Sequence, residues 1–323
     1  MKIAVVGCGA LGSYYGARLC RDGHEVHFLL RSDYEVVRRG GVRILSPEGD
    51  FHVQPKCART PEEIGISDLV LIGLKTTANA EFPKLIPPLV GATTAVLTLQ
   101  NGLGNEAQLA KLLGPEKILG GLCFVCLNRV EPGKIVHVAQ GQIVMGEFGR
   151  RPEPRTHDIA LAILHSGVPC KVTDNLEQAH WEKLVWNIPF NGLGVAGTAG
   201  YESVIRGEVG SREKLQPCLT TDLLLDGGRW EKLVRELMAE TIAAAQTSGL
   251  NVPDSTAEKQ IARTLEMGAY RASTLIDFER GQPLELESLF FEPLHQARNA
   301  GVKTPRLNAL CSILEQLNPR ASQ

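Results

Sequence analysis

A glycine-rich turn directly after a short apolar run constrains this chain more than any other feature. The run Lys2–Val6 is followed at once by Gly7-Cys8-Gly9-Ala10-Leu11-Gly12 and then by a helical pattern. A strand, a G-x-G-x-x-G turn and a helix in this order form the context that a dinucleotide-binding fingerprint requires. Gly7 allows the tight turn, Gly9 lets a pyrophosphate approach the backbone, and Gly12 lets the helix pack against the strand. We therefore expect all six residues of the turn to bind a nucleotide cofactor; the alternative is a glycine-rich turn without a ligand.

Length and composition indicate a globular protein of two domains. The chain has 323 residues, of which 43% are hydrophobic, and a net charge of −2 from 34 basic and 36 acidic residues. The chain lacks the surplus of basic residues that would favour nucleic acid or an anionic membrane as a partner. No apolar run is long enough to cross a bilayer. Because the first apolar run begins at residue 2, we expect no signal peptide. Eight scattered cysteines are typical of reduced thiols, so we expect a cytoplasmic protein.

One pair of cysteines has the C-x-x-C spacing of some metal and redox sites, in Cys123-Phe124-Val125-Cys126. The sequence holds no second pair with zinc spacing, and Leu122–Leu127 has the composition of a strand. Residues three apart in a strand face opposite sides, so the two sulfur atoms would not converge. We therefore expect no metal site.

The first half of the chain alternates strands with helices. A helix is expected at 10–22, a hairpin turn at Ser46–Asp50, and a short helix after the N-cap Thr60. Later strands are expected to pair in antiparallel fashion through short turns at Glu131–Gly133 and Gln140–Gly141. The expected strands are Lys2–Val6, Glu25–Leu30, Asp68–Leu74, Thr94–Leu99, Leu119–Leu127, Lys134–Val138 and Gln142–Met145. This alternation predicts an α/β fold with a Rossmann-type, doubly wound sheet.

In the second half of the chain, helical patterns replace the alternation of strands and helices. A helix at His157–His165 and a last strand at Pro169–Val172 are expected, and almost everything after Asp174 has helical periodicity. Long helices are expected at Trp230–Ser248 and Glu285–Asn299. The sequence thus predicts a cofactor-binding domain over residues 1–172 and an all-helical substrate domain over 173–323.

The end of the second strand indicates which cofactor binds. An acidic residue there holds the ribose 2′-hydroxyl of NAD, whereas an Arg accommodates the 2′-phosphate of NADP. Here the strand ends in Leu30-Arg31-Ser32, without an acid at its tip. We therefore expect NADP(H), with Arg31 at the phosphate; the alternative is an ordinary exposed arginine.

A polar stripe is expected on one helix of the second half. Lys183, Asn187 and Asn191 are spaced i, i+4 and i+8, while the rest of the helix is rich in apolar residues. A ketone that receives a hydride needs a proton donor, and Lys183 can supply the proton. His180 is a rival donor, and a solvated helix face is the alternative. Pro189 lies inside this helix, where a kink is expected.

Four stretches together resemble one family, the ketopantoate reductases (2-dehydropantoate 2-reductases). They are the glycine turn with Arg31, Lys75 with Leu99-Gln100-Asn101-Gly102, the Lys183–Asn191 helix, and Ser273 with Glu285. The resemblance covers nearly the whole chain. It implies a Rossmann domain, a helical domain, and NADPH-dependent reduction of 2-dehydropantoate to (R)-pantoate in pantothenate and coenzyme A biosynthesis.

The resemblance also implies roles for single residues. Lys183 matches the family's catalytic lysine, the general acid, and Glu285 matches a glutamate that holds the substrate hydroxyl. Substrate binding is implied for Asn187, Asn191, Ser273 and Asn101, and cofactor binding for Lys75 and, near the nicotinamide, for Asn101.

The chain departs from the family pattern in four places, one of which is Pro189 inside the lysine helix. The family usually has Thr-Glu-Ile-Asp around its glutamate, where this chain has Leu284-Glu285-Leu286-Glu287. Asn191 is followed by the glycine-rich run Gly192–Gly197, and Gly200–Leu219 is a candidate insertion. Position alone does not choose between Glu285 and Glu287, since both suit the first turn of a helix.

Two other functions stay open. One is reduction of a different 2-oxo acid by an NADP-dependent enzyme that resembles the β-hydroxyacid or opine dehydrogenases. The other is a catalytically silent NADP-binding sensor. In every case the expected ligand besides the cofactor is a small molecule, and the protein is expected to be a monomer or a homodimer.

Overall fold

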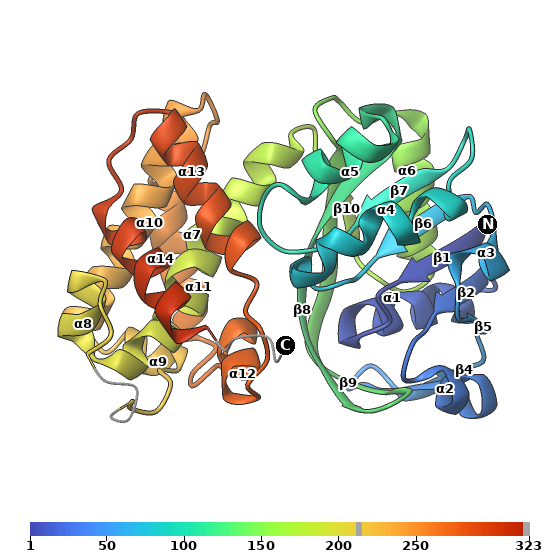
Figure 1. Ribbon diagram of the computed structural model, residues 1–323, viewed down its shortest axis with the longest axis horizontal. Coiled ribbons are helices and arrows are strands. Elements are labelled where there is room, and N and C mark those ends of the chain that lie inside the picture. The colour runs from blue at the N-terminus through green and yellow to red at the C-terminus, as the bar shows by residue number, and fades with distance from the viewer. Residues whose placement is uncertain (211–214, 319–323) are drawn as a thin grey trace. The chain divides into compact units, whose positions relative to one another are not determined.

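The computed structural model describes residues 1–210 and 215–318, and residues 211–214 and 319–323 lie outside the described part. The chain forms two compact units, Met1–Leu176 and Glu177–Gln323 (Figure 1). The first unit contains a large sheet and the second is helical, so the predicted fold class is confirmed. The candidate insertion Gly200–Leu219 includes residues 211–214, which lie outside the description.

One mixed sheet of ten strands runs through the fully described residues 1–176, in the order β4-β3-β9-β8-β7-β6-β1-β2-β5, with β10 beside β9. The pairs from β8 through β7, β6, β1 and β2 to β5 are all parallel, and β9 is antiparallel to β8. The strands are β1 (Lys2–Val6), β2 (Glu25–Leu29), β3 (Val42–Leu45), β4 (Phe51–Val53), β5 (Lys56–Ala58), β6 (Leu69–Ile72), β7 (Ala95–Thr98), β8 (Ile118–Glu131), β9 (Lys134–Glu147) and β10 (Cys170–Val172).

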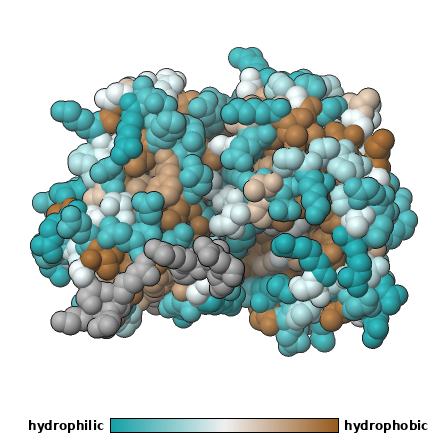
Figure 2. All heavy atoms as spheres, in the orientation of Figure 1, coloured by the Kyte–Doolittle hydropathy of each residue, from teal (hydrophilic) through white to brown (hydrophobic). Residues whose placement is uncertain are grey.

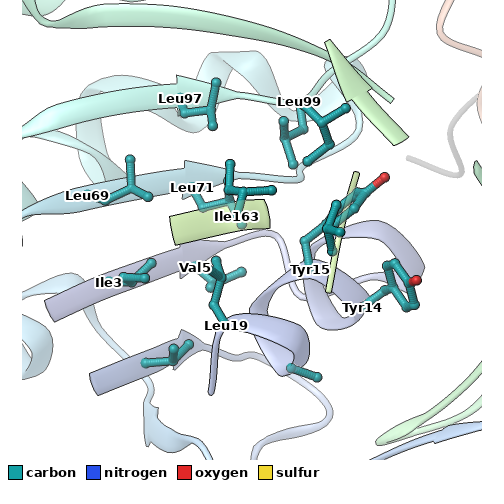
Figure 3. Close-up of a cluster of buried hydrophobic side chains, with 14 of the residues drawn as sticks. Ile3, Val5, Tyr14, Tyr15, Leu19, Leu69, Leu71, Leu97, Leu99 and Ile163 are labelled. Atoms are coloured by element: carbon teal, nitrogen blue, oxygen red, sulfur yellow. The ribbon is translucent and has the colours of Figure 1, made fainter. Parts of the chain in front are cut away.

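The sheet has a hydrophobic core on each face, as a doubly wound fold requires. Successive residues of β1 alternate between the two cores: Ile3 and Val5 belong to one, Ala4 and Val6 to the other. Figure 3 shows the first core, where side chains from β1, β6 and β7 meet the helix that follows the glycine turn. Every residue of β6 and β7 is buried, which explains why these strands are continuous apolar runs in the sequence.

The connecting helices of the first unit begin where the sequence places its start signals. α1 begins directly after Gly9, and α3 begins with Pro61 after the N-cap Thr60, as expected. α6 begins earlier than expected, at Pro154, because Pro is well tolerated at the first helical position and Glu153 forms a capping box with Thr156. The helices are α1 (Ala10–Arg21), α2 (Tyr34–Gly40), α3 (Pro61–Ile64), α4 (Phe82–Leu85), α5 (Asn105–Leu113) and α6 (Pro154–His165), with 3₁₀ turns η1 (Thr76–Glu81), η2 (Pro87–Leu89) and η3 (Pro115–Lys117).

The prediction of a turn at Gln140–Gly141 is wrong. β9 continues through these residues, and Phe124 and Val125 of β8 pair with Gln142 and Gln140, which leaves Gly141 as an extra residue in a β-bulge. Gln140 has φ of 63° and Gly141 has φ of 140°, values that suit a tight turn and a bulge equally. The hairpin turn at Glu131–Gly133 and the antiparallel pairing are confirmed.

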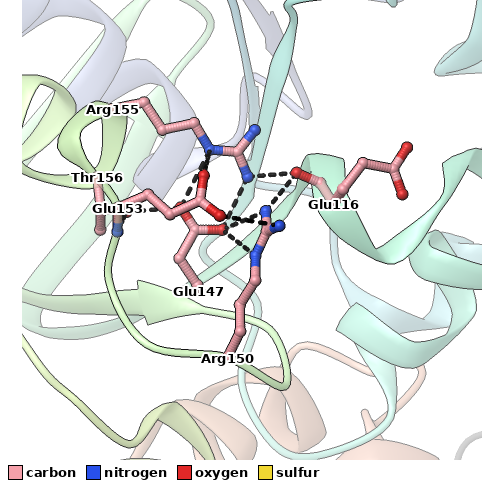
Figure 4. Close-up of polar contacts among 6 residues, drawn as sticks. All are labelled: Glu116, Glu147, Arg150, Glu153, Arg155 and Thr156. Carbon is pink, nitrogen blue, oxygen red and sulfur yellow. Dashed lines mark hydrogen bonds and ion pairs between the residues drawn. The ribbon is translucent and has the colours of Figure 1, made fainter.

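A buried ion cluster joins the end of β9 to the start of α6 (Figure 4). The side chain of Glu147 is fully buried and accepts hydrogen bonds from Arg155, Arg150 and the Thr156 hydroxyl, the last at 2.6 Å. Burial raises the pKa of Glu147, but these three hydrogen-bond donors outweigh it, so the pKa lies below the usual glutamate value. Both guanidinium groups also donate to the backbone oxygen of Glu116.

In residues 177–210 and 215–318, the elements of the second unit are helices. α7 continues through Pro189 as one element, and the glycine-rich run at its end is buried: a Cβ on Gly192 would lie 2.6 Å from Leu310, and one on Gly197 would lie 2.4 Å from Leu219. The run therefore lets neighbouring segments pack closely against α7. The elements are α7 (Leu176–Ala196), η4 (Gly197–Ala199), α8 (Tyr201–Arg206), α9 (Thr221–Leu224), α10 (Arg229–Thr247), α11 (Ser255–Leu265), α12 (Ser273–Glu279), the π-helix η6 (Glu287–Phe291), α13 (Glu292–Asn299) and α14 (Pro305–Leu317).

The helix expected at Glu285–Asn299 differs in its first part. It is divided into η6 and α13, and Glu285 lies just before the helical residues instead of in the first turn. Among the helices of the described residues, none combines the length and apolar character that a membrane span needs. Hydrophilic residues cover most of the face of each unit seen in Figure 2, with hydrophobic ones scattered among them.

Candidate functional site

Four of the predicted cofactor-binding positions follow strands that end together. Val6, the last residue of β1, is in register with Leu29 of β2 and Ile72 of β6, and Ile72 is in register with Thr98 of β7. The segments that leave these strands therefore start from one edge of the sheet, the carboxyl edge where ligands bind in folds of this kind. The predicted residues on these segments are Gly7, Arg31, Lys75 and Asn101.

The glycine turn has the geometry of a close backbone crossing. Gly7 has φ of 94°, and a Cβ there would lie 2.3 Å from the backbone nitrogen of Leu74. A Cβ on Gly12 would lie 2.3 Å from the carbonyl oxygen of Gly7, so α1 packs directly on the turn. A Cβ on Gly9 would meet nothing within 4 Å, and Gly9 is the N-cap of α1. The turn thus has a helix N-terminus and open space where the fingerprint requires a phosphate to approach.

The charged residues expected to bind the cofactor are accessible, and so is Ser32. Arg31 and Ser32 are exposed directly after β2, and Lys75 is exposed directly before η1. A phosphate that reached this edge would find cationic and hydroxyl donors there, and both are good phosphate ligands.

A chain of amide side chains fixes the loop that carries Asn101. The hydroxyl of Thr98 donates to Oε1 of Gln100 at 2.9 Å, and Nε2 of Gln100 donates to Oδ1 of Asn79 at 2.8 Å. Asn79 in turn donates to Oδ1 of Asn105 at 2.9 Å, and Nδ2 of Asn105 donates to the backbone oxygen of Asn101 at 3.1 Å. The chain joins the segments after β6 and β7. Asn79 and Asn105 carry no signal in the sequence, because neither belongs to a motif and the bonds between segments span 21 and 26 residues.

The second unit contains the stripe on α7. Asn187 and Asn191 are buried and Lys183 is half-buried. The amide nitrogen of Asn191 donates to Oδ1 of Asn187 at 3.3 Å. Oδ1 of Asn191 accepts from the backbone N–H of Thr274 at 3.1 Å and from the hydroxyl of Ser273 at 3.3 Å. The structure therefore brings together Asn187, Asn191 and Ser273 from two helices.

These bonds determine which way each amide points. A backbone N–H only donates, so the Thr274 N–H requires the oxygen of Asn191 on its side. Asn191 must then present its nitrogen to Asn187, and Asn187 must present its oxygen to Asn191. The two N–H groups of Asn187 then point away from Asn191, on a residue one helical turn after Lys183. This end of the stripe is therefore rich in donors and suits a ligand with acceptor oxygens. Thr274, which sets the direction, has no signal in the sequence.

One aromatic residue of α7, Trp186, contacts α11. The indole nitrogen of Trp186 donates to the hydroxyl of Thr264 at 2.9 Å, and its ring lies 5.1 Å from that of Phe190. One flank of the helix is thereby fixed in orientation. His180, the rival donor, is buried on the same helix.

Accessibility separates the two candidate glutamates. Glu287 is exposed on η6, whereas Glu285 is half-buried in the segment before it. This segment is also tied to the end of α14, since the backbone N–H of Leu284 donates to the side chain of Asn318 at 3.0 Å. Residues in a π-turn frequently adjoin functional sites. Within residues 1–210 and 215–318, no group of three or more His, Cys, Asp and Glu side chains is arranged to hold a metal ion.

Comparison with known proteins gives the family. A model of the family "Ketopantoate reductase PanE/ApbA" matches residues 3–150, and the model of its C-terminal part matches residues 215–318. A 2-dehydropantoate 2-reductase from Nostoc sp. is 39% identical over 99% of this chain and 96% of its own length.

Solved structures agree with this result. The crystal structure of 2-dehydropantoate 2-reductase from Geobacter metallireducens has a TM-score of 0.89 at 44% identity, over 98% of this chain and 99% of that one. The enzyme of the same name from Methylococcus capsulatus has a TM-score of 0.85 at 32% identity, over 98% and 96% of the two chains. The chain belongs to the ketopantoate reductase family.

Proposed function

We propose that this protein reduces 2-dehydropantoate to (R)-pantoate, with NADPH as the electron donor. The observation that carries the proposal is the donor end of the α7 stripe, where the bond to Asn191 leaves the amide nitrogen of Asn187 for another acceptor, one helical turn after Lys183. A 2-oxo acid offers carbonyl and carboxylate oxygens, which are acceptors only. The names of the Nostoc and Geobacter relatives support the same substrate.

The first unit is the proposed cofactor domain, and its residues fit a dinucleotide. Gly7, Gly9 and Gly12 would hold the pyrophosphate at the start of α1, where N–H groups and the helix dipole favour negative charge. Arg31 would bind the 2′-phosphate, and Lys75 and Asn101 would contact the cofactor at the same sheet edge. When bound, NADPH supplies a hydride to the carbonyl carbon of the substrate.

The second unit is the proposed substrate domain. Asn187 binds and orients the 2-oxo acid through its N–H groups, and Asn191 holds Asn187 in the required direction. Ser273 binds the carboxylate by turning its hydroxyl from Asn191 to the substrate. Lys183 donates a proton to the carbonyl oxygen as negative charge develops there, and its own charge stabilises that oxygen most strongly in the transition state. Glu285 accepts a hydrogen bond from the substrate hydroxyl.

The first experiment follows NADPH absorbance with purified protein and 2-dehydropantoate, beside 2-oxoisovalerate, which lacks the hydroxyl. We expect faster turnover with 2-dehydropantoate and a preference for NADPH over NADH. Equal rates with both cofactors would contradict the NADPH assignment. Turnover confined to other 2-oxo acids would favour the second enzyme function, and cofactor binding without turnover would favour a sensor.

A variant of the first unit tests the cofactor assignment further. Arg31→Ala should raise the KM for NADPH far more than that for NADH, because only NADPH carries the 2′-phosphate. An equal rise for both cofactors would remove Arg31 from the phosphate site.

A further inference from the structure

One acidic residue does lie near the end of β2, and the structure shows it paired. Asp33 follows Arg31 and Ser32 and is the N-cap residue of α2, yet its side chain does not cap that helix. Instead Oδ1 of Asp33 accepts a hydrogen bond from the Arg129 guanidinium at 2.6 Å and one from the Ser32 hydroxyl at 2.9 Å. The Asp33 side chain is only 10% exposed.

Arg129 reaches Asp33 from a distant part of the chain. It lies near the end of β8, where a register shift between Arg129 and Glu131 interrupts the pairing with β9. Such a shift re-aims a side chain relative to a regular strand. In Figure 1 the hairpin that joins the end of β8 to the start of β9 lies next to β4 and α2. Asp33 immediately precedes α2.

The Asp33 carboxylate also interacts electrostatically with the glycine turn. Burial, followed by the Cys57 thiol and then the Asp33 carboxylate, raises the pKa of the Cys8 thiol well above its usual value. Cys8 stands between Gly7 and Gly9. Asp33 therefore belongs to the same sheet edge as the residues proposed to bind the cofactor.

The charge on Asp33 has opposite consequences for the two cofactors. An unneutralised carboxylate there would repel a 2′-phosphate, whereas it would accept a hydrogen bond from a free ribose 2′-hydroxyl. The Arg129 guanidinium neutralises the carboxylate and occupies one of its oxygens. The Arg129–Asp33 pair thus removes the repulsion of the 2′-phosphate of NADPH. It also removes the hydrogen bond that Asp33 would accept from the 2′-hydroxyl of NADH.

We propose that Arg129 is a positioning residue that sets the preference for NADPH over NADH, by holding and neutralising Asp33 beside Arg31 and Ser32. This inference rests on the proposed function, because it assumes that the adenosine end of the cofactor lies at the end of β2.

The test measures the Kd of NADPH and of NADH for Arg129→Gln by cofactor fluorescence, without substrate. Binding of NADPH should weaken and binding of NADH should tighten, so that the ratio of the two Kd values changes by about tenfold. A merely structural role would weaken both cofactors together. Lys134→Gln removes a positive charge from the same hairpin, where Lys134 pairs with Glu131, and should leave both Kd values unchanged.

Two further variants keep the inference testable if Arg129→Gln does not fold. Arg129→Lys keeps the charge and should retain most of the preference. Asp33→Asn removes the carboxylate and should leave NADPH binding intact or tighter, without any gain for NADH. In the double variant Asp33→Asn with Arg129→Gln, the gain for NADH should disappear, because it depends on the Asp33 carboxylate.

Suppose that the parent protein binds NADPH. An equal rise of both Kd values in Arg129→Gln would then overturn the inference, and so would weaker NADPH binding in Asp33→Asn. A parent protein that binds neither cofactor would overturn the proposed function and this inference together. A parent that binds NADPH but does not reduce 2-dehydropantoate would contradict the substrate only, and the Kd ratios would still decide the role of Arg129.

Discussion

The amide nitrogen of Asn191 donates to the side-chain oxygen of Asn187, one turn earlier on α7, at 3.3 Å. The backbone N–H of Thr274 donates to the side-chain oxygen of Asn191 and so fixes the orientation of that amide. Through its bond to Asn187, Asn191 fixes the orientation of the second amide as well. Two buried asparagines therefore act as one unit with a defined donor end. A reversal of Asn191 should reverse Asn187 as well.

Asn191→Asp tests this directly. The aspartate can still accept from Thr274, but it faces Asn187 with an oxygen, so Asn187 should rotate and present its own oxygen to the ligand. We expect the KM for the 2-oxo acid to rise about tenfold or more, with little change in the Kd of NADPH. Steady-state kinetics with a separate cofactor titration would measure both.

The matched control is Asn251→Asp, which makes the same change at an exposed position of the second unit. It should leave the KM for the 2-oxo acid as in the parent. An unchanged KM in Asn191→Asp, with the fold intact, would show that the direction of the Asn187 amide does not matter for binding.

Lys183→Ala should lower kcat by about 10²–10⁴-fold, the usual range for loss of a positioned proton donor. The Kd of NADPH should change little. Lys183→Arg should not restore the rate, because a guanidinium hardly releases a proton. The measurement is kcat at saturating substrate, with cofactor binding checked separately.

Lys232→Ala, which removes an exposed lysine from α10, serves as the control and should keep the parental rate. If Lys183→Ala binds NADPH normally and retains more than about a third of the parental kcat, Lys183 is not the general acid. His180, buried on the same helix, would then be the next residue to change.

Local patterns in the sequence were sufficient for the framework of the fold. The apolar runs of β1, β6 and β7, the start of α3 at Pro61 and the long helix α7 depend on neighbouring residues, and the structure confirms them. Gln140–Gly141 shows the limit of such patterns. A polar residue with positive φ beside a glycine suits a hairpin turn and a bulge equally, and only the pairing of β9 with β8 distinguishes them.

Contacts between distant segments could not be predicted from the sequence. Arg129 and Asp33 are 96 residues apart, and Thr274 and Asn191 are 83 apart. Each pair joins elements whose relative position is set by the packing of the whole unit, not by spacing along the chain. The individual candidate residues could therefore be named, whereas the bonds that orient them could not.

Glu285→Ala should distinguish substrates by their hydroxyl group. A half-buried carboxylate that accepts a hydrogen bond from the substrate hydroxyl would favour this substrate over an analogue without the hydroxyl. The variant should therefore lose more activity with 2-dehydropantoate than with 2-oxoisovalerate, as measured by kcat/KM for each. Glu287→Ala, at an exposed position two residues later, should affect neither substrate. A common loss factor for both substrates in Glu285→Ala would mean that Glu285 does not recognise the hydroxyl.

Glu147 should make the stability of the protein depend on pH. Its folded pKa is lowered by the hydrogen bonds from Arg155, Thr156 and Arg150, so its contribution is fully present above the ordinary glutamate pKa and is lost as the pH falls through the folded value. Glu147→Gln removes the buried negative charge that pairs with both arginines and should lower the free energy of unfolding by about 3 kcal/mol at neutral pH. The difference between parent and variant should shrink as the solution is made more acidic. Urea unfolding at a series of pH values would measure it.

Glu131→Gln provides the comparison, because Glu131 forms an ion pair with Lys134 while its own side chain is 65% exposed. An exposed pair contributes little, so this variant should differ from the parent by less than about 1 kcal/mol at every pH. The contrast isolates burial as the cause, since both changes remove one carboxylate charge from a strand of the β8–β9 pair. A Glu147→Gln protein as stable as Glu131→Gln at neutral pH would show that the cluster in Figure 4 does not stabilise the fold.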